Sequence, residues 1–241
     1  EKINIMALPK INQAIRYEMT IPSSQKKITY RPYFVKEEKI LMQAYEAEDE
    51  SVSMRAMLDT VLACIYDTVI PSSLTSYDVE YMFTQIRAKS VGETSKIIAS
   101  CTKMDCEEKT KLSINLMDVM VQNGQKTDVK DTVELSDNIR IELKYPSFES
   151  YLSIWNADKN DVDFGMEMVP FCIKAVVVGD ERITDWGEED MIDFIDSMTN
   201  DQFNNISEFI QNSPSLRHEV EFECKCGHKN RTVMEGLSDF F

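Results

Sequence analysis

Glycine and histidine are scarce in this sequence, which narrows the chemistry that the chain can support. The 241 residues include seven glycines and two histidines, and no GxGxxG, P-loop or GxSxG motif occurs. Few positions therefore let the backbone approach a phosphate closely, and His218 and His228 offer little for acid–base or triad catalysis. The acidic side chains mostly occupy solvated faces of amphipathic segments. We expect no catalytic or cofactor-binding residues and no small-molecule substrate.

Basic residues and long hydrophobic runs are also lacking. Lysine and arginine number 26 against 42 aspartates and glutamates, and the formal net charge of −16 repels phosphate backbones and anionic lipids. No apolar run reaches the roughly 18 residues of a membrane span, and EKINIMALPK lacks the layout of a secretory signal. These features predict a folded cytosolic protein that binds neither nucleic acid nor membrane.

Apolar periodicity predicts an α+β fold, in which β-hairpins share a small antiparallel sheet with about seven helices. The first hairpin is expected within 15–35, and the other predicted strands cover 93–100, 111–121, 138–146, 216–223 and 229–236. The predicted helices cover 35–48, 51–70, 74–92, 147–157, 163–178, 188–198 and 201–212. Ser51 and Ser76 are expected to be N-caps, and Pro170 should kink or break its helix.

A polar stretch at 122–138 and the strand that ends at Pro146 predict a division of the chain. Residues 6–146 would form an N-terminal α+β half with two hairpins and three helices. Residues 147–241 would form a mostly helical half, ending in a cysteine-tipped hairpin that returns to the sheet of the first half. The closing Leu237, Phe240 and Phe241 form either a docked tail or an apolar contact for a partner.

Cysteines are few for this length, with six in all, and four of them lie at the bends of two predicted hairpins. Cys64 and Cys172 fall in apolar helical patterns, where a small buried thiol is ordinary. The segments SKIIASCTKMDCEEKTKLSINL (95–116) and RHEVEFECKCGHKNRTVMEG (217–236) share one plan, because each places two cysteines between two alternating strands. A disulfide framework is not expected.

The two bends, if they meet, supply four thiolates for a structural zinc ion: Cys101, Cys106, Cys224 and Cys226. The spacings Cys-x4-Cys and Cys-x-Cys depart from the Cys-x-x-Cys of most zinc knuckles. However, positions i and i+2 of an extended segment share a face, His228 could replace a missing sulfur, and Gly227 can supply a positive φ. Two alternatives stay open, which are reduced thiols without metal and a redox-active pair.

Several extended stretches resemble one protein family in the same order along the chain. They are MALPKINQ, ITYRPYFVKEEKILMQAYEAED, FTQIRAKSVGETSKI and LRHEVEFECKCGHKNRTVMEGLSDFF. This layout resembles the baseplate hub assembly proteins and hub subunits of T-even-type contractile-tailed phages, over nearly the whole chain. The cysteine pair at 224 and 226 fits the resemblance. Residues 1–5 precede the usual MALP start and are expected to be an extension before it.

The resemblance implies a phage tail morphogenesis protein that binds other baseplate hub and tail proteins as an assembly factor, a chaperone or a hub subunit. It implies no reaction, and it places the protein in the host cytoplasm during assembly and, as a retained subunit, in the virion baseplate. Two alternative functions belong to other classes of protein. One is a thiol- or metal-dependent enzyme at the cysteine bends, and the other is a zinc-ribbon adaptor unrelated to phage assembly.

Overall fold

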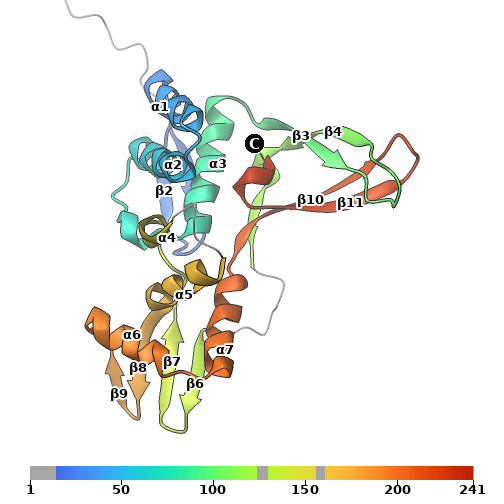
Figure 1. Cartoon of the computed structure of the whole chain (residues 1–241). Coiled ribbons are helices and arrows are strands. Elements are labelled where there is room, and N and C mark those ends of the chain that lie inside the picture. Colours follow the sequence, from blue (N-terminus) through green and yellow to red (C-terminus); the bar gives the residue numbers. More distant parts are fainter. Residues whose placement is uncertain (1–14, 124–129, 156–160, 241) are drawn as a thin grey trace, which may run out of the picture.

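The computed structural model describes residues 15–123, 130–155 and 161–240 (Figure 1). The predicted extension at 1–5 lies outside these ranges. Within them the chain forms seven α-helices and eleven strands, which confirms the α+β class. The strands form four separate antiparallel sheets of two, three, two and four strands, where a single shared sheet was expected. Each hairpin is therefore covered by different neighbours.

The N-terminal hairpin and three of the four helices around it supply the first part of the core. Strand β1 (Tyr17–Thr20) pairs with β2 (Lys27–Tyr30), as predicted. The helices around it are α1 (Val35–Glu46), α2 (Glu50–Cys64), α3 (Ser76–Ser90) and α4 (Phe148–Ile154). Ile28, Leu58 and Met82 are buried together between these elements. The fully buried aliphatic side chains hold the hairpin against α2 and α3.

The predicted boundaries of α2 and α3 need correction. Helix α2 ends at Cys64, six residues before the predicted end at residue 70, because Ile65 turns to an extended conformation and bridges to Tyr30. The N-caps are Asp49 and Thr75 rather than the predicted serines. Asp49 accepts hydrogen bonds from the amides of Ser51 and Val52, and Thr75 accepts one from the amide of Asp78. Aspartate and threonine are, like serine, preferred N-cap residues.

A second core lies under a four-stranded sheet made of β6 (Thr132–Ser136), β7 (Ile139–Leu143), β8 (Ile173–Val178) and β9 (Glu181–Ile183). Helices α5 (Asp161–Cys172), α6 (Glu188–Asp196) and α7 (Asn200–Gln211) accompany it. Strands β7 and β8, from either side of residue 146, are hydrogen-bonded neighbours. Ile206 and Phe209 on α7 pack against Ile141 of the sheet.

Helix was predicted through 163–178 with a kink or break at Pro170, and this prediction was wrong in the last six residues. Helix α5 continues past Pro170 without a break but ends at Cys172, and residues 173–178 form strand β8. The run Val176, Val177 and Val178 is β-branched, which favours a strand. Because β8 is paired on both edges by β7 and β9, its backbone hydrogen bonds are better satisfied in the sheet than in a longer helix.

Two long hairpins extend side by side away from the helices (Figure 1). One is β3 (Thr94–Ser100) with β4 (Lys109–Asn115), and the other is β10 (Ser215–Glu223) with β11 (Lys229–Glu235). Strand β5 (Met120–Gln122) pairs with the start of β10, so the last hairpin returns to a strand of the N-terminal half. We call these two hairpins and their connecting loops the hairpin arm.

The closing residues dock at the base of the hairpin arm. Phe240 is fully buried in a short 3-10 turn (Leu237–Phe240), and its carbonyl accepts a 2.6 Å hydrogen bond from Ser95 Oγ. Phe240 therefore belongs to a docked tail, whereas Phe241 lies outside the described residues. Across the described ranges, none of the helices combines the length and the apolar character that a membrane crossing requires.

Glu80 on α3 should make the folding stability depend on pH. Burial raises the pKa of its carboxyl from 4.5 to about 7. The folded state then holds this proton more tightly than the unfolded state, so the contribution is fully present below about pH 4.5 and is lost as the pH rises through about 7. Urea unfolding of Glu80→Gln between pH 5 and 8 should give a flatter stability curve than the wild type. Glu46→Gln, at an exposed position on α1, should keep the wild-type slope, and identical slopes for all three proteins would contradict the assignment.

Candidate metal centre

The loops at the far end of the hairpin arm each place two cysteines at a tight bend. Cys101 directly follows β3, and its amide donates to the carbonyl of Glu108 at 3.1 Å, which closes the first loop. In the second loop the amide of Cys224 donates to the carbonyl of His228 at 2.9 Å. Gly227 has φ +82°, the left-handed conformation expected for it. The strands on either side thus fix where the thiols point.

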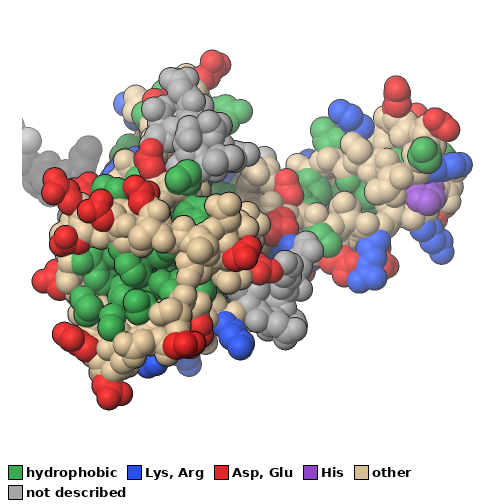
Figure 2. Space-filling model, turned by 60° about the horizontal axis from the view of Figure 1, so that its bottom comes forward, with side chains coloured by type: hydrophobic (Ala, Val, Ile, Leu, Met, Phe, Trp, Pro, Cys, Tyr) green, Lys and Arg blue, Asp and Glu red, His purple; other side chains and the backbone are tan. Residues whose placement is uncertain are grey.

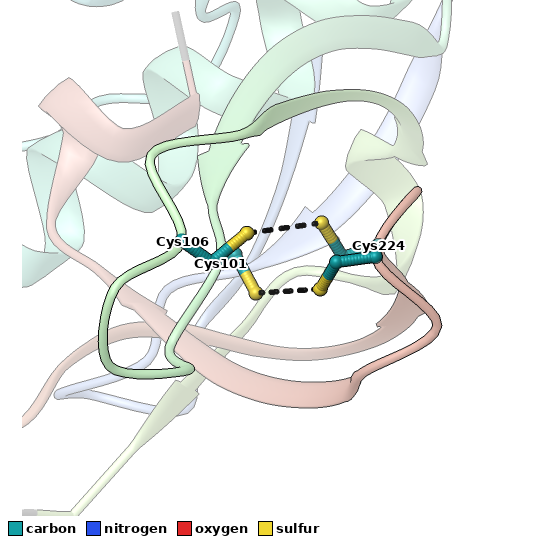
Figure 3. A group of neighbouring side chains, drawn as sticks. Cys101, Cys106 and Cys224 are labelled. Carbon is teal, nitrogen blue, oxygen red and sulfur yellow. Dashed lines mark hydrogen bonds between the residues drawn. The ribbon is translucent and has the colours of Figure 1, made fainter.

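The four sulfurs of the two loops lie together, although the pairs are far apart in the sequence. Cys101 Sγ is 3.8 Å from Cys226 Sγ, and Cys106 Sγ is 3.9 Å from Cys224 Sγ (Figure 3). All four sulfurs lie within 4.8 Å of one another, and all are free thiols. Around a tetrahedral ion with metal–sulfur distances of about 2.3 Å, sulfurs would be about 3.8 Å apart. The cluster therefore has the size and donor set of a zinc tetrathiolate.

Backbone amides hydrogen-bond three of these sulfurs and shift the thiol pKa values in different directions. The amide of His228 lowers the pKa of Cys226 to about 7. The amide of Glu108 acts in the same direction on Cys106, but burial and the neighbouring thiols outweigh it and raise that pKa to about 12. At Cys224 the amide of Cys226 is likewise outweighed by burial and neighbouring thiols, so the pKa is raised. In metal sites, hydrogen bonds from backbone amides of this kind stabilise the thiolates that bind the metal ion.

The two loops are also joined by a polar contact that the sequence patterns did not reveal. Asn230 is buried, and its Oδ1 accepts hydrogen bonds from the amide and the hydroxyl of Thr102 at 2.7 and 2.9 Å. Its Nδ2 donates to the carbonyl of His228 at 3.0 Å. Thr102 follows Cys101 directly, so this contact fixes one loop against the other beside the sulfurs. A single buried asparagine in an alternating strand gives no periodic signal, which is why pattern reading missed it.

Both histidines and the other two cysteines lie outside the sulfur cluster. Nε2 of His228 lies 3.4 Å from the hydroxyl of Thr102. The four sulfurs come together without His228, so it is not needed as a replacement for a missing sulfur. His218 is paired opposite Met234 in β10 and β11. Cys64 and Cys172 are buried, and burial raises their thiol pKa values to about 11 and about 12. They behave as the small apolar side chains predicted for them.

Comparison with known proteins gives one result for nearly the whole chain. The family model described as T4 bacteriophage base plate protein matches residues 14–241. A search of curated proteins and a search of solved structures both gave no match. The matched range includes both hairpins of the arm and all four clustered cysteines. The chain therefore belongs to the T4 bacteriophage base plate protein family.

Proposed function

We propose that this protein is a non-catalytic morphogenesis factor that binds other baseplate proteins while the central hub is built. The observation that carries the proposal is the hairpin arm, which projects from the helical body and exposes apolar side chains. Met104 at the first cysteine loop is 89% exposed, and Ile98 and Val233 on the strands are 64% and 54% exposed. Apolar side chains on a projecting, two-hairpin element suit contact with another protein.

We also propose that Cys101, Cys106, Cys224 and Cys226 bind a structural zinc ion that fastens the tips of the arm. The sulfur separations and the amide donors described above support this assignment. With four protein ligands no position is left for a substrate or a reactive water, so the ion would stabilise the fold without taking part in a reaction. The arm would then present its apolar side chains from a fixed frame.

The role during assembly is either that of a transient chaperone or that of a retained hub subunit. A transient chaperone would act only in the host cytoplasm, covering apolar surface of an unassembled hub protein and then leaving. A retained subunit would also be present in the finished baseplate. Comparing the amount of this protein in assembly intermediates with that in purified virions distinguishes these two roles.

Complementation of a phage that lacks the protein tests the proposed function. Supplying a double variant, Ile98→Glu with Met104→Glu, should lower the yield of assembled hubs by about tenfold or more, because central apolar contacts dominate protein interfaces. Sedimentation and electron microscopy of the lysates measure that yield. The control is Val35→Glu, which replaces an apolar side chain by glutamate on α1, where Val35 is 78% exposed, and it should complement like the wild type. Normal assembly with a folded double variant would reject the arm as the binding surface.

A further inference from the structure

Helices α5 and α6 lie at the end of the molecule away from the tips of the hairpin arm (Figure 1). A groove lined mainly by apolar side chains lies between them. Its volume is about 800 Å³, which is in the range of binding pockets. Its apolar lining includes Met166, Phe171, Trp186, Met191 and Ile192. Met191 is buried at its base, whereas Met166 and Ile192 are about half exposed, at 50% and 48%. A gathering of exposed apolar side chains of this kind marks an interaction surface.

The groove is bordered by negative charge. Among the described residues that line it, three are acidic and none is a lysine or arginine. Glu188 and Asp196 line the groove and occupy the two ends of α6, which places their backbones about 12 Å apart along the helix axis. Among the described residues no salt bridge joins either of them to a basic side chain. Figure 2 views this end of the molecule and shows hydrophobic side chains surrounded by acidic ones.

These charges distinguish between the candidate occupants of the groove. A second copy of this chain would bring a net charge of −16 against a negative border, which opposes association. A helix with one apolar face and basic side chains at its ends would bury the exposed apolar side chains and pair with both carboxylates. A spacing of about 12 Å corresponds to about eight residues of helix. Methionines in the lining can adapt to the exact shape of such a helix.

We propose that this groove binds an amphipathic helix of another baseplate protein, with an apolar face about two turns long and a lysine or arginine near each end. The inference rests on the proposed function, since it specifies the chemistry of one partner segment. It adds a second binding surface to the hairpin arm, at a separate place in the fold. The two surfaces would let one molecule hold two different partners.

Two synthetic peptides test the proposal with the purified full-length protein. The first is an 18-residue helix with leucines on one face and lysines seven or eight residues apart, and the second replaces each lysine by glutamate. Fluorescence anisotropy should show binding of the lysine peptide, at least about tenfold weaker binding of the glutamate peptide, and weaker binding of the lysine peptide as salt is raised. Trp186 lines the groove, so binding of the lysine peptide should also change the tryptophan emission, and this change should be lost in Trp186→Phe. Equal affinities, or no binding of the lysine peptide, would overturn the proposal.

Matched variants locate the binding site. Ile192→Arg, and independently Met166→Arg, should weaken binding of the lysine peptide by about tenfold, whereas Val35→Arg, which adds the same charge on α1, should not. Unfolding curves of the three variants check that each is folded. If both groove variants bind the lysine peptide as tightly as the wild type does, the groove is excluded as the binding site.

Two other occupants predict different results, and each would replace the proposed partner. If residues 1–14 fill the groove, protein starting at residue 15 should bind the lysine peptide much more tightly than the whole chain. If a second copy fills it, analytical ultracentrifugation should show a dimer that Ile192→Arg converts to monomer. Because these measurements use purified components, peptide binding can succeed even if complementation shows that the protein has no part in hub assembly.

Discussion

Purified protein should contain about one zinc ion per chain, and Cys224→Ser protein should contain less than about a tenth of that amount. Cys224 is 3% exposed and lies within 3.9 Å of the sulfur of Cys106. A serine at this position removes one of four thiolates and leaves a hydroxyl that binds zinc poorly. Metal analysis by mass spectrometry measures the zinc content directly.

The stability of the arm should change together with its zinc content. Because structural zinc contributes about 10–16 kcal/mol of apparent binding free energy in small zinc-finger peptides, losing it here should lower the free energy of unfolding by at least about 3 kcal/mol. An excess of chelator should have the same effect on the wild type and little further effect on Cys224→Ser. Cys64→Ser is the control, since Cys64 is buried in α2 and its loss should leave the zinc content unchanged. Metal-free protein with four freely titrating thiols would rule out the zinc site.

Asp78→Ala should destabilise the protein by roughly 3–5 kcal/mol, because four hydrogen bonds to one buried carboxylate are lost. Asp78 is fully buried in the first turn of α3. Its carboxylate accepts from the amide and hydroxyl of Ser23 at 2.9 and 2.6 Å, and from the amide and hydroxyl of Thr75 at 2.9 and 2.8 Å. One side chain therefore joins the turn of the first hairpin to the cap of α3.

Equilibrium unfolding in urea at neutral pH measures this loss. The matched control is Asp59→Ala, at an exposed position on α2, which should change the free energy of unfolding by no more than about 0.5 kcal/mol. Asp78→Asn should also be destabilising, since its amide group places a donor where all four partners donate. A loss below about 1 kcal/mol for Asp78→Ala would mean that water or a neighbouring group replaces the carboxylate.

The helices were predictable from the sequence because their apolar residues recur at helical spacing against polar neighbours. Each of the seven predicted segments contains a helix over more than half of its length. The segment 163–178 was wrong in its last six residues, which form β8. They are apolar except for Lys174, and a buried helix and a buried strand then give the same pattern. Strand β6, within the polar stretch at 122–138, was missed for the opposite reason. It lies at one edge of its sheet, so it needs few apolar residues.

The candidate site was predictable in part. The shared plan of the two cysteine-bearing hairpins indicated that their thiols could converge, and the structure places all four within 4.8 Å. The contact between Thr102 and Asn230 was not predictable, because a pairing 128 residues apart has no local signature. The groove was missed because apolar spacing in 188–212 indicates which side of a helix is apolar but not what covers it. Ile206 and Phe209 are covered by the core, whereas Ile192 is not.

The sulfur contacts between the two loops have a consequence for synthesis on the ribosome. They join residues 125 and 118 positions apart. At translation rates of about 5–20 residues per second, Cys106 emerges about 6–24 s before its partner Cys224 exists. The first loop must stay reduced and unaggregated during that interval. A chain that terminates before Cys226 cannot form both sulfur contacts. The complete arm therefore forms only in molecules that have been translated through Cys226.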